Sequence, residues 1–371
     1  AALKTHFCLK NGIYFFKEVS QVLNSCKDID EFDIIPSLKP EDTSCPFVLN
    51  GIKLGIFSWC VKDLFSYVYT ELKAARKCAT IQDKGKHVMD LSQVILLLHS
   101  EDYTVWNLRK YYVAGQTKIY GKAELDFCAL VLRKHPRSAE TFSHRRWLIS
   151  LLQEKTEKMV ETQEFLLEEL DLTLVCAERY RDNYIAWDQR CWVVDNFLCG
   201  KVKWLETELT SIKDWLWTHV SDNCVYHFRQ HLLEKLSSNC TLTKMKELLL
   251  EEFKLTDEML KYYSVFETIW YHRRFLISFW STKIGTCYAC LQLWKNKHNL
   301  CQEQEGRSLR KCDCCIDQGQ IVSFQCEIEL CQQIINNPKQ TRQADLAKSQ
   351  LTWLNHFCEK LLERTLDSPI F

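Results

Sequence analysis

One short pattern recurs five times in the sequence and constrains the fold more than any other feature. Each copy has an aromatic residue followed, three positions later, by an arginine. Measured between the aromatic residues, the copies are 36, 45, 39 and 44 residues apart. The pairs are Trp106–Arg109, Phe142–Arg145, Trp187–Arg190, Tyr226–Arg229 and Trp270–Arg273. Five matches at near-regular spacing identify an internal repeat, and such periods are typical of repeat architectures.

The residues around each pair predict a helical hairpin. In the third copy Asn183 is the expected N-cap, whose side-chain oxygen accepts a hydrogen bond from a backbone N–H group. Apolar residues recur at helical spacing before and after this start: Leu167, Leu170, Leu174, then Trp187, Val194 and Leu198. One hairpin cannot bury its apolar face, so we expect the units to stack into a right-handed α-solenoid. The aromatic residue and the arginine should form the repeat core, with the guanidinium reaching helix-end carbonyls.

Composition favours an all-α chain with short connections. The 371 residues include only 10 glycines and 6 prolines, while 46% are hydrophobic, and average usage of glycine and proline is roughly 7% and 5%. Three prolines fall in residues 1–50, which we interpret as an irregular strap before a repeat domain at 51–371. A helix is expected from about Gly55 to Lys77. A weak sixth unit is indicated by Trp353, Phe357 and Leu361.

The 20 cysteines require an interpretation. Many lie inside apolar helical patterns, where cysteine behaves as a small hydrophobe, and no signal-peptide pattern opens the sequence. We therefore expect reduced thiols and a cytoplasmic protein. Residues 281–318 interrupt the repeat as a variable cysteine-rich insertion. Its Cys287, Cys290, Cys312 and Cys314 have near zinc-ribbon spacing, although the second pair is Cys-x-Cys, so a structural zinc site and a variable loop both stay open.

Charge and hydropathy argue against two classes of partner. Lys+Arg and Asp+Glu balance at 48 each, so the chain has no basic surplus for nucleic acid or anionic lipid. The longest apolar runs, such as residues 94–98, are too short to span a bilayer. We expect no nucleic-acid partner and no stable membrane insertion. A Gly-rich phosphate loop, a Ser/His/Asp triad context and a His-Glu-x-x-His motif are also missing from the sequence.

Three copies of the motif, DYTVWNLRK, NYIAWDQRCW and TIWYHRRF, resemble the repeat of the protein prenyltransferase α-subunit family. The resemblance covers about residues 55–280. The segments IDEFDIIP and KLGIFSWCVK extend it toward a divergent member, rather than a farnesyltransferase or Rab geranylgeranyltransferase α subunit proper. It implies a crescent of helical hairpins wrapped around a β subunit, which would hold the zinc and the geranylgeranyl diphosphate. This chain would then bind no metal and would be inactive alone.

The resemblance implies a function for the pair of subunits. The chain would be the α-type subunit of a heterodimeric protein geranylgeranyltransferase and would work with the β subunit of the Rab enzyme. The substrates would be C-terminal cysteines of proteins that already carry one lipid. Two alternatives stay open: a non-catalytic scaffold that binds a protein on its concave face, and a scaffold whose cysteine-rich zinc module does the binding.

The family's residues near the diphosphate fall on the second and third repeats. The resemblance places its lysine at Arg137, which keeps the positive charge that a departing diphosphate requires. The family's tyrosine position is Ala139, which has no hydroxyl. In the third repeat, Asn-Tyr-His becomes Asn183, Tyr184 and Ile185. The alternatives are an exposed arginine after a helix-breaking proline and an asparagine that only caps its helix.

Glu140 marks a further departure from the family. A farnesyltransferase-like α subunit has glutamine there, which meets the C-terminal carboxylate of a CaaX substrate. Two carboxylates at close range repel, so Glu140 predicts poor reading of a CaaX end. We therefore take Arg137 as the candidate catalytic residue and Glu140, Asn183 and Tyr184 as candidate substrate-binding residues.

Overall fold

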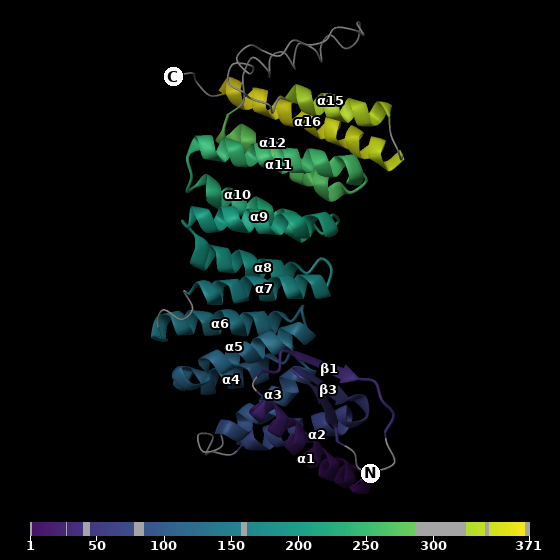
Figure 1. Cartoon of the computed structure of the whole chain (residues 1–371), viewed down its shortest axis with the longest axis vertical. Helices are drawn as coiled ribbons and strands as arrows, with labels where there is room; N and C mark the ends of the chain where they lie inside the picture. Colours follow the sequence, from purple (N-terminus) through teal and green to yellow (C-terminus); the bar gives the residue numbers. More distant parts are fainter. Residues whose placement is uncertain are drawn as a thin grey trace. The chain divides into compact units, whose positions relative to one another are not determined.

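The computed structural model describes residues 2–26, 28–39, 45–77, 85–156, 162–285, 324–337 and 341–367. The chain divides into two compact units, residues 1–197 and 198–371. Both units are built mainly from antiparallel helices (Figure 1). The predicted helical-repeat class is confirmed.

The first unit contains three repeat hairpins. They are α3 (Gly85–Leu98) with α4 (Tyr103–Gly115), α5 (Thr117–Lys134) with α6 (Ala139–Thr156), and α7 (Gln163–Arg179) with α8 (Tyr184–Val193). We call the first helix of each hairpin helix A and the second helix B. Each helix A packs on its own helix B, the A helices pack on one another in order, and so do the B helices. This is the nearest-neighbour stacking expected of a solenoid.

The second unit continues the same pattern. Its hairpins are α9 (Val202–Thr218) with α10 (Asn223–Ser237), α11 (Leu242–Tyr263) with α12 (Glu267–Lys283), and α15 (Phe324–Asn336) with α16 (Thr341–Asp367). Helix B of each hairpin contacts helix B of the next. The predicted sixth unit is therefore a helical hairpin. In α16 the rings of Trp353 and Phe357 stack with centroids 5.0 Å apart.

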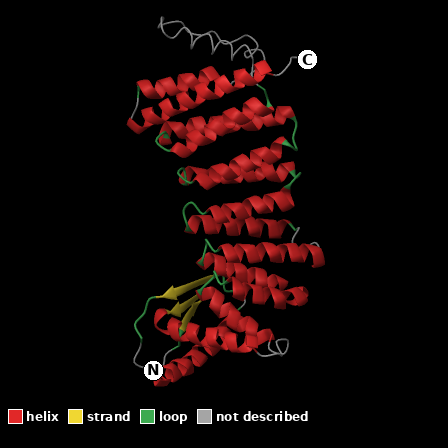
Figure 2. Ribbon diagram, turned by 180° about the vertical axis from the view of Figure 1, so that it is seen from behind, coloured by secondary structure: helices red, strands yellow, loops and turns green. Residues whose placement is uncertain are grey.

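The first 50 residues are not the irregular strap that the prolines predicted. They contain helix α1 (Ala2–Ser25) and strands β1 (Glu31–Ile35) and β2 (Phe47–Asn50), which join β3 (Lys53–Phe57) in a three-stranded sheet (Figure 2). The strand order is β1-β3-β2, with β1 parallel and β2 antiparallel to β3. The predicted helix at Gly55 begins instead at Ser58, as α2 (Ser58–Lys77), because Gly55 lies in β3 against Ile35. Short apolar runs such as KLGIF favour strands.

All five aromatic–arginine pairs of the predicted repeat core are buried in the structure. The five aromatic residues are between 1% and 3% exposed, and the five arginines between 2% and 5%. Two of the tryptophans also satisfy their indole N–H groups inside the core. Trp106 donates to the carbonyl oxygen of Ser100 at 2.8 Å, and Trp270 donates to that of Ser264 at 3.0 Å. A buried N–H group without a partner would be costly, so these bonds fix the orientation of the rings.

The arginine heads meet different partners from those predicted. They were expected at helix-end carbonyls, but the carbonyls that accept from them lie in helix interiors, as Met89 does for Arg109. Four of these heads are also seen to pair with a buried glutamate on helix A of the next hairpin. The pairs are Arg109–Glu124, Arg145–Glu169, Arg229–Glu252 and Arg273–Glu327. A buried guanidinium requires a counter-charge, which no helix end supplies.

In three of these links, those through Glu124, Glu252 and Glu327, a third residue also contacts the glutamate. His144 contacts Glu124 at 2.9 Å and His272 contacts Glu252 at 3.2 Å, through Nε2 in both cases. In the last hairpin, Gln350 donates to Glu327 at 2.9 Å. Each of these residues lies on helix B of the following hairpin, so one link joins three helices through hydrogen bonds to a single carboxylate. Neighbouring repeats are thus held by directional contacts as well as by apolar packing.

The structure describes only some of the cysteines to which the predictions apply. Cys287, Cys290, Cys312 and Cys314 lie outside the described residues. The cysteines whose side chains the structure describes are free thiols. Burial raises the pKa of the Cys60 and Cys176 thiols to about 12, which suppresses thiolate chemistry at these core positions.

Candidate functional site

Asn183 ties two successive hairpins together. Its side-chain oxygen accepts a hydrogen bond from the backbone N–H of Ala186 and so caps α8. Its amide donates to the carbonyl oxygens of Pro136, at 2.6 Å, and Cys176, at 3.0 Å. The predicted cap is confirmed. Because the side chain is fully buried and both its oxygen and its nitrogen are engaged, Asn183 supports the site from beneath rather than contacting a substrate.

Arg137 lies at the surface directly after Pro136, in the turn between α5 and α6. Its guanidinium carbon is 4.5 Å from the ring centroid of Tyr180 and 5.8 Å from that of Tyr184. Hydrogen bonding to Tyr180, and then to Tyr184, raises the pKa of Arg137 above its ordinary value. The site is therefore a permanent positive charge held against two phenol rings.

A tight turn brings the two tyrosines together. Tyr180 follows the last residue of α7 and Tyr184 is the first residue of α8. Between them Asp182 has φ 53°, in the left-handed region that aspartate tolerates better than most residues. Tyr184 donates its backbone N–H to the carbonyl oxygen of Asp182 at 2.9 Å. Both side chains stay accessible, with 45% of Tyr180 and 60% of Tyr184 exposed.

The cations around Arg137 are neutralised, but Arg137 is not. Three neighbouring basic residues reach acidic residues of the β1 region, in the pairs Arg133–Asp30, Lys134–Asp33 and Arg179–Glu31. Among the described residues no carboxylate lies within ion-pair distance of Arg137. The unneutralised guanidinium fork is suited to bind the oxygens of a phosphate or diphosphate.

Three residues near Arg137 complete the description of the site: Ala139, Tyr180 and Glu140. Ala139 is exposed at the start of α6 and offers no hydroxyl. Tyr180, which sequence reasoning missed, supplies a phenol beside Arg137 from the neighbouring hairpin. The signal for it was a second tyrosine four residues before Tyr184. Glu140 is half-buried in the first turn of α6, where a carboxylate is favoured by the helix dipole.

Half-exposed tryptophans lie on the B helices of the first unit. The ammonium of Lys110 is 5.6 Å from the ring centroid of Trp147, and the guanidinium carbon of Arg146 is 5.7 Å from that of Trp192. Arg146 also donates to Asp188 at 2.7 Å. Lys110 and Arg146 each follow a repeat arginine directly. Cation-clamped aromatic residues at a surface are typical of protein-binding faces.

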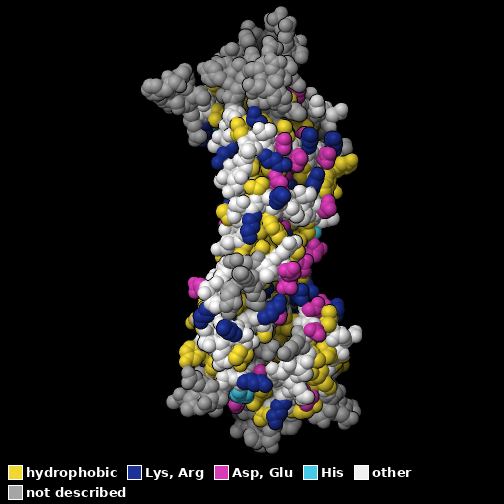
Figure 3. Space-filling model, turned by 60° about the vertical axis from the view of Figure 1, so that its left-hand side comes forward, with side chains coloured by type: hydrophobic (Ala, Val, Ile, Leu, Met, Phe, Trp, Pro, Cys, Tyr) yellow, Lys and Arg dark blue, Asp and Glu magenta, His cyan; other side chains and the backbone are white. Residues whose placement is uncertain are grey.

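The described residues limit other kinds of site. They contain no group of three or more His, Cys, Asp or Glu residues arranged to hold a metal ion. No described helix combines the length and apolar character needed to cross a bilayer. On the face shown in Figure 3, basic and acidic side chains are interspersed, without a broad basic field.

Stacked hairpins linked through a buried aromatic–arginine motif define an α-helical repeat protein. The family model for the protein prenyltransferase alpha subunit repeat matches residues 122–152, 166–197, 205–236 and 249–280. The protein prenyltransferase alpha subunit repeat-containing protein 1 of Danio rerio is 31% identical over 305 residues, covering 71% of each chain. The Homo sapiens protein of that name is 29% identical over 303 residues, covering 70% of this chain and 75% of its own. This chain belongs to the protein prenyltransferase alpha subunit repeat family.

A more distant relative is the geranylgeranyl transferase type-2 subunit alpha of Rattus norvegicus. It is 26% identical over 203 residues, which cover 51% of this chain and 33% of the rat protein. The likeness links the chain to prenyltransferase α subunits at the level of the repeat.

Proposed function

We propose that this chain is the α-type subunit of a heterodimeric protein geranylgeranyltransferase, acting in the cytoplasm on C-terminal cysteines of proteins that already carry one lipid. The observation that carries the proposal is the exposed Arg137 with Tyr180 and Tyr184 around it. Family membership supports the same reading, because the α-subunit repeat is its defining element.

The chemistry requires a positive charge at the departing diphosphate. When geranylgeranyl moves to a cysteine sulfur, negative charge grows on the diphosphate oxygens. Arg137 stabilises that charge with two parallel N–H donors. Tyr180 and Tyr184 position the guanidinium and offer hydroxyl donors. They would replace the family's tyrosine, whose position is occupied by Ala139 in this chain. Asn183 keeps the two turns in register through the Pro136 carbonyl.

The remaining parts of the reaction are assigned to a partner. The thiolate form of the acceptor cysteine would be favoured by a zinc ion, and we place both the zinc and the geranylgeranyl diphosphate in a β subunit of the type that serves Rab geranylgeranyltransferase. Trp147 and Trp192 on the B helices provide anchors for that subunit, since aromatic residues carry much of the energy in protein interfaces.

The test uses the chain purified with that β subunit. Geranylgeranyl transfer to a folded, monolipidated protein with a free C-terminal cysteine is measured by mass spectrometry. We expect Arg137→Ala to lower kcat by about 10²-fold, as removal of one charge-stabilising donor does, and Arg137→Lys to retain much of it. The matched control is Arg181→Ala, because the Arg181 side chain is 71% exposed and forms an ion pair with the adjacent Asp182. An unchanged kcat for Arg137→Ala in an intact complex would remove Arg137 from the reaction.

A non-catalytic scaffold is the second candidate. It is favoured by the cation-clamped Trp147 and Trp192, which require only a protein partner. The two functions separate in the same assay. A scaffold binds its partner through these tryptophans but supports no transfer with any β subunit, and substitution of Arg137 leaves its binding unchanged.

A further inference from the structure

Helix α2 has an apolar stripe that the described residues of the first unit cover only in part. The helix packs on α1, α3 and β3 with its other faces. Val61, Phe65 and Tyr69 follow at intervals of four residues and are only half-buried. The rings of Phe65 and Tyr69 stack, with centroids 5.7 Å apart and an angle of 14° between their planes. Residues at this spacing form one continuous helix face.

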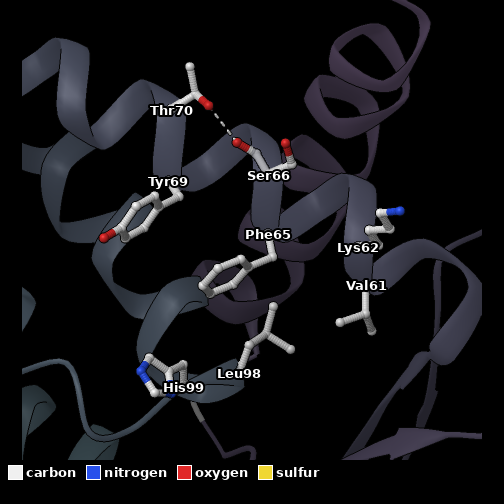
Figure 4. Close-up of a pocket in the computed structure, with 8 residues that line it drawn as sticks. All are labelled: Val61, Lys62, Phe65, Ser66, Tyr69, Thr70, Leu98 and His99. Carbon is white, nitrogen blue, oxygen red and sulfur yellow. Dashed lines mark hydrogen bonds between the residues drawn. The ribbon is translucent and has the colours of Figure 1, made fainter. Parts of the chain in front are cut away.

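This stripe borders a hollow in the first unit (Figure 4). Its volume is about 590 Å³, and the end of α3 closes one side with Leu98 and His99. Figure 4 shows Phe65, Tyr69, Leu98 and His99 around the hollow, and Lys62 also belongs to its lining. The hollow is open to solvent along α2. Its lining is predominantly apolar, so filling it would remove apolar surface from water.

The polar groups beside the stripe are few and partly satisfied. The hydroxyl of Thr70 donates to the carbonyl oxygen of Ser66 at 2.7 Å, within α2 itself. A site for a small polar ligand normally has several convergent polar groups that fix its orientation. This hollow instead has an elongated, mainly apolar lining, which suits the apolar face of a helix.

The lining of the hollow carries positive charge and no negative charge. None of the eight lining residues is acidic, whereas Lys62 is among them. One turn beyond the stripe, the ammonium of Lys73 lies 4.4 Å from the ring centroid of Tyr69. An occupant with carboxylates beside its apolar ridge would complement these cations and gain in association rate and specificity.

We propose that the α2 groove, defined by Val61, Phe65, Tyr69, Leu98 and His99, docks an amphipathic helix of a protein partner whose apolar stripe is flanked by acidic residues. Apolar side chains at positions i, i+4 and i+7 of that helix fill the hollow, as in other helix-in-groove complexes. Its carboxylates face Lys62 and Lys73. This docking site is separate from Arg137, and its readout does not depend on prenyl transfer.

The test measures binding of two fluorescein-labelled, helix-stapled peptides to the full chain by fluorescence anisotropy. Both peptides carry leucines at i, i+4 and i+7, and one is flanked by glutamates, the other by lysines. We expect the acidic peptide to bind saturably, at least about ten-fold more tightly than the basic one. Tyr69→Ala and the surface variant Lys73→Glu should each weaken it about ten-fold. Tyr111→Ala, at an exposed tyrosine of α4 in the same unit, is the matched control and should change nothing.

Three results would overturn the proposal. The first is equal binding of the acidic and basic peptides. The second is acidic-peptide binding that survives both Tyr69→Ala and Lys73→Glu, since the peptide would then bind elsewhere. The third is binding of palmitate with loss in Tyr69→Ala while neither peptide binds, which would assign the groove to a lipid chain. Circular dichroism melting confirms that each variant is folded, and Lys73→Glu keeps the test decisive if Tyr69→Ala is unstable.

Discussion

The side-chain amide of Asn183 donates a hydrogen bond of 2.6 Å to the carbonyl oxygen of Pro136, across two successive hairpins. The residues after these two, Arg137 and Tyr184, lie with the guanidinium carbon 5.8 Å from the ring centroid. A partly buried hydrogen bond thus sets the distance between two exposed groups. The candidate site is rigid because it is built on helix ends tied to the core, which is how functional groups are held in a fixed geometry.

The link between Arg145 and Glu169 should contribute strongly to stability. Arg145→Met leaves a buried carboxylate without its cation, and we expect a loss of about 3–5 kcal/mol in the free energy of unfolding. The double variant Arg145→Met/Glu169→Met should recover most of that loss. Urea denaturation measures both, with Arg181→Met as an exposed control within about 0.5 kcal/mol of wild type. If the losses of the two single variants simply add in the double variant, the pair is not coupled.

Stability should fall as the pH is lowered. Burial lowers the pKa of His144 from its ordinary 6.5, so below that pH the unfolded chain takes up a proton before the folded chain does. Burial alone would raise the pKa of Glu124, but the charge of Arg109 and a hydrogen bond from His144 hold it at about 2, below its ordinary 4.5. The unfolded carboxylate therefore also protonates first. Both groups contribute stability at neutral pH that is lost in acid.

A single substitution isolates the contribution of His144 to the pH dependence of stability. Gln350 occupies the place of His144 in the last link and donates to Glu327, so His144→Gln should keep the hydrogen bond to Glu124 without a titrating ring. Urea denaturation between about pH 7 and pH 5 should show a shallower decline of stability for this variant than for wild type. An identical slope would mean that His144 does not titrate with unfolding.

Sequence reasoning recovered the features whose signal is local. Trp106 and Arg109 lie one helical turn apart, so their pattern predicted both the helix and its buried face. The glutamate partners could not be predicted because the separation from arginine to glutamate varies: 15 residues for Arg109, 24 for Arg145 and 54 for Arg273. No fixed period marks them. The contact between Arg137 and Tyr180 also escaped, since it depends on the left-handed backbone of Asp182.

Glu140 should control how well the complex uses a CaaX peptide as a substrate. In the complex with the β subunit, Glu140→Gln should raise geranylgeranyl transfer to short CaaX peptides, because it removes a carboxylate that faces the terminal carboxylate of the peptide. Transfer to the folded, monolipidated protein should change little. The matched control is Glu154→Gln, at an exposed glutamate near the other end of α6. Equal peptide activity of wild type and Glu140→Gln would contradict this role.

The central claim is that the chain works as one half of a heterodimer. Sedimentation velocity of the chain, alone and with the β subunit of a type-2 geranylgeranyl transferase, tests it most directly. The account predicts a stable 1:1 complex, weakened on the order of 10²- to 10³-fold by the double variant Trp147→Ala/Trp192→Ala, which removes two aromatic anchors worth about 2 kcal/mol or more each. A chain that stays monodisperse and does not associate with any prenyltransferase β subunit offered would contradict it.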